Sequence, residues 1–162
     1  MAFDVKKRKR ELIKEYVKNV PEAAKGELLT RILILSIFIA RAFLIVFELI
    51  FCVSTETKIS VWSYVLFVPF LLVIYMIYDG NKSFVSIPMI SAPIRILYYF
   101  SSVLPSIEGG AAGALTVISI LVLAIQFFAS IVMSANSKCA IYFTAMQKVN
   151  LKVRSEMLGG KK

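Results

Sequence analysis

Two ionisable residues interrupt an almost purely apolar stretch of the chain and are the first candidates for chemistry. Residues 35–53 hold Arg41 and Glu48 among aliphatic and aromatic side chains, and residues 87–104 hold Arg95 in a similar setting. A charged group at the centre of a bilayer costs about 2.5–3.5 kcal/mol on insertion scales, so such groups pair with one another or mark a path for ions or protons. We therefore expect the three residues to belong to one polar site.

The charges of this site do not balance. Glu48 follows Arg41 by seven residues, about 10.5 Å along a helix that rises 1.5 Å per residue. Arg95 lies at a similar depth in a segment that crosses in the same direction. Arg41 and Glu48 can pair only if they lean toward each other, and Arg side chains in helices point back toward the N-terminus. Pairing of Glu48 with Arg95 across helices is geometrically as plausible. One carboxylate then faces two guanidinium groups.

Four sources of the missing negative charge are open. The first is an internal network of the bundle's own polar groups, and the second is an acidic residue on a partner subunit. The third is an aqueous path that favours anions or other polar solutes, and the fourth is snorkelling to a lipid phosphate, which the depth disfavours. Glu48 could also carry a proton. The predicted intramembrane network consists of Arg41, Glu48, Arg95, Gln126, Tyr98, Ser91 and Ser119.

The segments that must position this network are long apolar runs. Apolar residues make up 59% of the 162 residues, above the roughly 45–50% of soluble domains. They gather in runs long enough to cross a hydrocarbon core of about 30 Å. The predicted spans are about 30–53, 61–78, 87–104 and 111–134. Each carries one polar stripe, which predicts an all-α membrane protein whose 21–134 region is a four-transmembrane-helix bundle with a polar interior.

The distribution of Lys and Arg predicts the orientation of the bundle. Nine lie at or before Arg31, one is Lys82 between the second and third spans, and six follow the fourth span, whereas only Lys58 falls on the other side. Basic residues are enriched in cytoplasmic loops. Both termini are therefore predicted to be cytoplasmic, with the plasma membrane as the expected location. The hydrophobic run from Leu28 is too long for a cleaved signal peptide and is expected to stay as an anchor.

The two ends of the chain are predicted to be basic amphipathic helices. In the N-terminal segment 1–20, apolar residues recur at helical spacing. The segment would lie on an anionic membrane surface or form a solvated basic tail. Pro21 and Glu22 are suited to begin the next helix. The C-terminal segment 135–162 has a second apolar stripe, and its continuity with the fourth span is left open. The predicted membrane-surface or partner-docking residues are Lys6, Lys7, Arg8, Lys9, Arg10, Lys148, Lys152 and Arg154.

Several classes of chemistry lack their residues. The chain has no histidine, no predicted intramembrane carboxylate pair and no lysine within a predicted span, so we expect no catalytic site, no metal and no cofactor. Cys52 and Cys139 are predicted on opposite sides of the membrane, and no disulfide is expected. The net charge of +9 is concentrated at the two ends, which favours membrane orientation over nucleic-acid binding.

These features predict a small non-enzymatic integral membrane protein that acts as an assembly or accessory subunit of a membrane complex. The buried Arg and Glu residues would serve helix–helix or subunit contacts. The expected partners are the lipid bilayer, with anionic lipids at the cytoplasmic face, and a second copy or another membrane protein. The alternative is a small oligomeric channel or transporter, anion-selective or proton-linked, including holin-like permeabilisation.

Overall fold

The computed structural model describes residues 2–55, 65, 67–103 and 110–159, and every regular element in this part of the chain is helical. The helices are linked in places by short turns of 3₁₀ or π geometry. In chain order the elements are α1 (Ala2–Ile13), a π turn (Lys14–Lys18), α2 (Pro21–Thr55), α4 (Phe67–Tyr78), a 3₁₀ turn (Lys82–Val85), α5 (Ser86–Tyr98), a π turn (Tyr99–Val103), α6 (Gly110–Ala135) and α7 (Ser137–Gly159).

Three of the described helical stretches are long and apolar enough to cross a membrane. They are Pro21–Phe51, Lys82–Ser101 and Gly113–Ala135. Their positions agree with the predicted first, third and fourth spans, and α2 begins at Pro21 as predicted. The described part of the predicted second span is α4, a shorter apolar helix. The earlier part of that predicted span, 61–64 and 66, lies outside the described residues.

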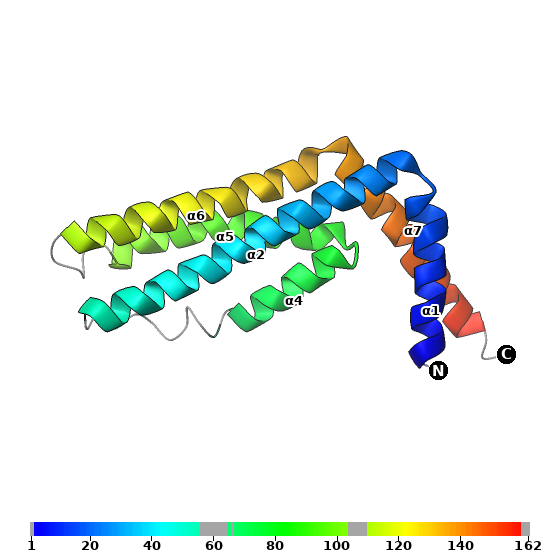
Figure 1. The fold of residues 1–162 in the computed structure, drawn as a ribbon, viewed down its shortest axis with the longest axis horizontal. Helices are drawn as coiled ribbons and strands as arrows, with labels where there is room; N and C mark the ends of the chain where they lie inside the picture. The colour runs from blue at the N-terminus through cyan, green and yellow to red at the C-terminus, as the bar shows by residue number, and fades with distance from the viewer. Residues whose placement is uncertain (1, 56–64, 66, 104–109, 160–162) are drawn as a thin grey trace.

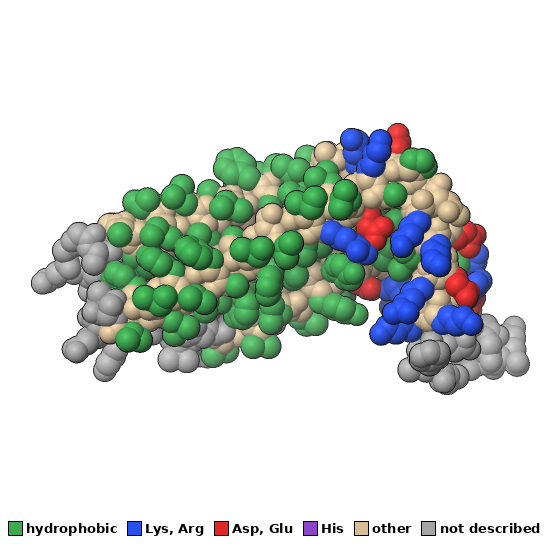
Figure 2. Space-filling model, in the orientation of Figure 1, with side chains coloured by type: hydrophobic (Ala, Val, Ile, Leu, Met, Phe, Trp, Pro, Cys, Tyr) green, Lys and Arg blue, Asp and Glu red, His purple; other side chains and the backbone are tan. Residues whose placement is uncertain are grey.

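The apolar helices lie side by side and form an elongated bundle (Figure 1). α6 packs against both α2 and α5, while α4 packs against α2. Large apolar side chains also cover the outside of the bundle, as Figure 2 shows. A soluble monomer rarely exposes so large an apolar surface, and a lipid-facing surface needs one. The described helices thus have the surface of a membrane protein.

The two terminal helices cross one end of this bundle as a pair (Figure 1). Leu12 of α1 and Val149 and Val153 of α7 form a small core between them, and Val17 packs into the main core of the bundle. Leu12 of the predicted N-terminal stripe is therefore covered by α7, and Val17 of the same stripe is covered by the bundle.

A helix break separates α6 from α7. The Asn136 side-chain oxygen accepts hydrogen bonds from the backbone N–H groups of Lys138 (2.9 Å) and Cys139 (3.4 Å), which is the bonding of an N-cap. The C-terminal helix is thus a separate element and not a continuation of the fourth span. This break turns α7 away from the bundle axis, so that it meets α1.

The turn that follows Tyr78 connects α4 to α5 at this same end. Gly80 adopts a φ of +91°, a conformation that glycine accepts without steric cost. A β-carbon at Gly80 would also collide with Met146 of α7. The turn is therefore held against α7, and the α4–α5 connection lies beside both terminal helices.

Close approach of α2 to α7 depends on a second glycine. A β-carbon at Gly26 would collide with the backbone carbonyl of Lys138, whereas one at Gly113 would meet nothing within 4 Å. Gly113 belongs to the weak GxxxG pattern with Gly109, and Gly109 lies outside the described residues. Packing therefore requires glycine at position 26 but not at position 113.

We predict that Gly26→Ala destabilises the protein by about 1–3 kcal/mol, because a rigid backbone atom must move to admit the methyl group. Gly113→Ala is the matched control and should leave stability unchanged or raise it slightly, since alanine favours helix. Thermal unfolding in detergent, followed by circular dichroism, measures both. Equal stability of the two variants would contradict the close approach of α2 and α7.

Candidate functional site

Two of the three buried charges of the bundle, on α2 and α5, meet at Glu48. Glu48 of α2 is fully buried, and its Oε1 lies 3.6 Å from Arg95 Nη2 on α5. Ile34, Arg41 and Glu48 follow one another at seven-residue spacing, and all three are buried. Of the two pairings that the spacing allowed, the structure brings Glu48 to Arg95 across the helix interface.

Arg41 lies elsewhere in the interior. Its side chain is only 6% exposed, and its guanidinium carbon stands 5.4 Å from the ring centroid of Phe70 on α4. A cation over an aromatic face is attracted by the ring quadrupole, more strongly when both are desolvated. Phe70 was not predicted from the sequence, because it is one of many apolar residues in its segment. Its role becomes visible only when α4 is packed against α2. The arginine is thus covered by the chain's own α4.

The site contains polar atoms that find no hydrogen-bond partner among the described residues. They include both Glu48 carboxylate oxygens, Arg41 Nε and Nη1, and Arg95 Nη1. On α6, the hydroxyls of Thr116 and Ser119 are also buried without a hydrogen-bond partner among the described residues. Most buried polar groups in native proteins have a partner, so a concentration of this kind marks a polar site rather than an ordinary helix interface.

A second polar contact joins α5 to α6 about two turns away. Gln126 Nε2 donates to the Pro88 carbonyl oxygen (2.8 Å) and to Ser91 Oγ (3.1 Å). The Ser130 hydroxyl donates to the Gln126 backbone carbonyl (2.8 Å). Gln126 and Ser91 of the predicted network therefore meet each other and not the charged residues.

Tyr98 does not share the interior with the rest of the predicted network. It is 39% exposed, whereas its neighbour Tyr99 is buried, and the two rings meet edge to face at 6.2 Å. The predicted network placed Tyr98 on the same inward face of the third span as Ser91 and Arg95. The inward position at this level belongs to Tyr99, which continues the buried face of Pro88 and Ala92.

The end of the bundle carries a second group of charges, which holds α1 and α7 together. Arg8 donates from Nε and Nη2 to the two carboxylate oxygens of Glu156 (2.9 and 3.0 Å) and from Nη1 to Glu11 (3.3 Å). Lys9 pairs with Asp79 in the α4–α5 turn. We call these two helices together with this turn the terminal layer. Its charged side chains gather over one end of the molecule in Figure 2.

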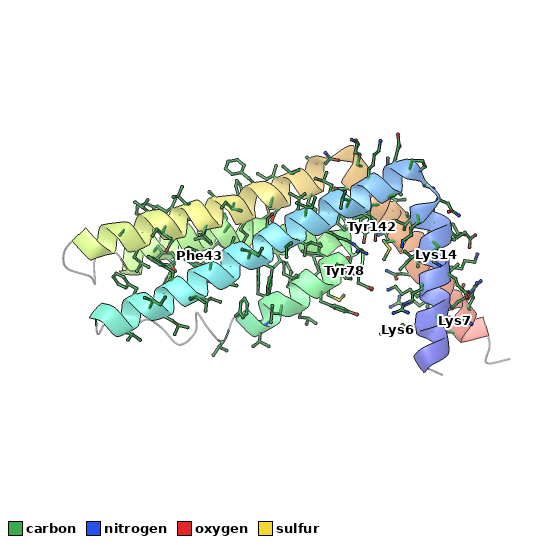
Figure 3. All side chains as sticks on the ribbon, viewed as in Figure 1. Lys6, Lys7, Lys14, Phe43, Tyr78 and Tyr142 are labelled. Atoms are coloured by element: carbon green, nitrogen blue, oxygen red, sulfur yellow. The ribbon has the colours of Figure 1, made fainter. Side chains whose placement is uncertain are left out.

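Further contacts attach the terminal layer to the bundle. The Tyr142 hydroxyl donates to the Tyr78 carbonyl at 3.3 Å, and these residues face each other where α7 meets α4 (Figure 3). Burial raises the pKa of Tyr142, which keeps this donor protonated. Asn150 Nδ2 donates to the Asp79 carbonyl at 3.1 Å. The layer is thus a folded part of the protein.

The predicted docking residues divide into two groups. Arg8, Lys9 and Lys152 make contacts inside the layer; the Lys152 ammonium lies 5.4 Å from the Tyr16 ring centroid and 3.5 Å from its hydroxyl. The others keep their side chains exposed. These exposed residues are Lys6, Lys7, Arg10, Lys148 and Arg154.

A shallow, mainly apolar groove of about 350 Å³ lies where α2 begins against α7. Its lining includes Tyr16, Val20, Ile141 and Lys148. Cys139 is buried nearby in the main core. Within the described residues, no three His, Cys, Asp or Glu side chains come together as a metal site would require.

Comparison of the chain with protein families, with curated proteins and with solved structures finds no match. The interpretation of both groups of charges therefore depends on their geometry.

Removing one partner of the Glu48–Arg95 pair leaves the other charge buried, which typically costs about 3–5 kcal/mol. We predict this loss for Arg95→Leu and a smaller loss for the double variant Glu48→Leu/Arg95→Leu. Reversible unfolding in mixed micelles gives the four free energies of the double-mutant cycle. Additive losses in the cycle would show that the two side chains do not interact.

The Arg8–Glu156 pair predicts that the terminal layer loosens in acid. The hydrogen bonds and charge of Arg8 lower the pKa of Glu156. Its stabilisation is therefore complete above the ordinary glutamate pKa of about 4.3 and is lost as the pH falls through the lowered value. Spin labels at Lys7→Cys and Ser155→Cys, in a background without Cys52 and Cys139, should give a distance distribution that broadens in acid.

The matched control for the acid experiment is Glu156→Gln. It should show a broad distribution at neutral pH and little further change in acid. A distribution in the unmodified pair that stays narrow through the whole acid range would contradict this role of Glu156.

Proposed function

We propose that this protein is a small non-enzymatic multi-pass membrane protein that serves as an assembly or accessory component of a membrane complex. Its terminal layer would lie in the cytoplasm and its bundle in the plasma membrane. The observation that carries the proposal is the folded terminal layer, which places exposed cations beside a bundle whose outer surface is apolar. Among the residues that the structure describes, the charged surface open to a partner is concentrated at that end.

The positions of the connections support a four-crossing topology. α2 begins at the terminal layer, the turn at Asp79 returns to it, and the α6–α7 junction at Asn136 lies beside it. A chain that leaves this end, returns, leaves and returns again crosses four times. α4, with the residues before it, would make the second crossing. The excess of Lys and Arg at this end supports a cytoplasmic location.

The buried charges support the same proposal. Arg41 and Glu48 are enclosed by the helices of this chain. A partner in the membrane would therefore find little of either side chain exposed on the bundle surface. An acidic side chain from another subunit would have to displace Phe70 to reach Arg41. We therefore expect subunit contacts to be made by the terminal layer, with a second copy or another protein.

Extraction in native-lipid particles tests this proposal through the size of the complex and the proteins that co-purify. Arg8→Glu should open the layer and lose the complex, because it places a third carboxylate beside Glu11 and Glu156. The double variant Arg8→Glu/Glu156→Arg exchanges the two charges of the pair and should restore the complex. Lys7→Glu makes the same charge change without a contact in the layer and should keep the complex. A single copy with no companion in the unmodified protein would contradict the proposal.

Transport is the second candidate, and the unpartnered polar atoms around Glu48 favour it. A hydrated chain of Glu48, Arg95 and Ser119 could relay protons or admit anions through the bundle. Purified protein in liposomes should then dissipate a pH gradient, and Glu48→Gln should abolish this activity. Arg41→Leu should alter anion selectivity. Gradients that persist at high protein density would exclude this candidate.

A further inference from the structure

The terminal layer extends beyond the bundle that carries it. Lys9 and Asn150 both reach Asp79 at the edge of the bundle. The first residues of α1 and the last residues of α7 continue past this edge, as Figure 1 shows, and contact each other there through Arg8 and Glu156. We call this part the overhang.

Helical register determines which side of the overhang faces the membrane. On α1, Ile13 packs against the main core of the bundle, and Lys9 pairs with Asp79. Arg10 and Lys6 precede Ile13 by three and seven residues, so they lie on the same face of the helix. In Figure 3, Lys6 lies on the side of α1 toward the bundle and Lys7 on the other side.

The same rule applies to α7. Met146 contacts the turn at Gly80 and Asn150 contacts Asp79. Arg154 and Met157 follow Asn150 by four and seven residues and therefore continue this face past the bundle edge. Both are exposed, and Met157 is 50% exposed although it is apolar. The bundle-facing side of the overhang thus combines three cations with one exposed methionine.

Among the side chains that the structure describes, the carboxylates close to this side are engaged in ion pairs. Arg8 holds Glu156 and Glu11, and Lys9 holds Asp79. The charges of Lys6, Arg10 and Arg154 are therefore available to an external anion. With the bundle upright in a bilayer, the overhang lies at the level of the lipid headgroups, where basic residues are attracted to anionic lipids and apolar side chains enter the interface.

We propose that the overhang binds the phosphate headgroups of anionic phospholipids through Lys6, Arg10 and Arg154, with Met157 inserted at the interface. This inference rests on the membrane orientation in the proposed function. The predicted surface was the whole basic set at both ends. The structure reduces it to one side of two helices and replaces the predicted apolar stripe of residues 1–20 with a single methionine.

The test places a fluorophore at the contact. Met157→Trp in a Trp62→Phe background makes this the only tryptophan, since the chain has one. The purified protein is inserted in nanodiscs of phosphatidylcholine, with or without phosphatidylglycerol, that contain a lipid spin-labelled at its headgroup. Strong quenching is expected with phosphatidylglycerol, and it should weaken in high salt because screening shortens the Debye length.

Two triple variants with the same change in charge identify the surface. Lys6→Glu/Arg10→Glu/Arg154→Glu should reduce the anionic-lipid quenching to the level in neutral lipid, with about a fivefold loss in lipid preference for each cation removed. Lys7→Glu/Lys14→Glu/Lys148→Glu reverses exposed lysines away from this side and should retain it. Circular dichroism and the distance between α1 and α7 verify that each variant is folded.

Equal quenching in neutral and anionic nanodiscs, or equal loss in the two triple variants, would overturn the proposal. So would a tryptophan that no lipid quenches. The measurement uses the purified protein alone, so it does not depend on a partner. Lipid-dependent quenching without any companion protein would contradict only the assembly function, and a companion without quenching would contradict only this inference.

Discussion

The turn at Asp79 is the contact on which the arrangement of the chain depends. Its carboxylate pairs with Lys9 of α1, its carbonyl accepts a hydrogen bond from Asn150 of α7, and the next residue, Gly80, admits Met146 at close range. One short connection therefore touches both terminal helices. This contact fixes both ends of the chain at one end of the bundle, and it builds a polar layer where the membrane would end.

The interior follows a different principle from the terminal layer. In the layer, the ion pairs are exposed to water, where each pair contributes little energy but sets the geometry. In the bundle, Glu48 approaches Arg95, while Arg41 stacks on Phe70. The excess positive charge is thus partly answered by an aromatic ring, which was not among the four sources considered from the sequence. Both Glu48 carboxylate oxygens and Nη1 of Arg95 are among the buried polar atoms left without hydrogen-bond partners, which sets this contact apart from an ordinary packed interface.

Sequence periodicity predicted the helical class, the start of α2 at Pro21, the turn at Gly80 and the inward position of Arg41 and Glu48. Those features depend on local propensity and on which residues share a helical face. The pairing of α1 with α7 was not predictable, because an apolar stripe does not reveal whether lipid or another helix covers it. The break at Asn136 needed no glycine or proline, since the Asn136 side chain caps the N-terminus of α7. Tyr98 faces outward because the buried face of this segment follows Pro88, Ala92 and Tyr99, and Tyr98 does not share their helical register.

Cysteine labelling in intact cells is the most direct test of a terminal layer on the cytoplasmic side. Cys139 cannot serve, because it is buried, so single cysteines are placed at Lys7, Ser155 and Lys58 in a background without Cys52 and Cys139. An impermeant thiol reagent should label the cysteine at position 58 in intact cells and those at positions 7 and 155 only after permeabilisation. Labelling of position 7 or position 155 in intact cells would contradict the account.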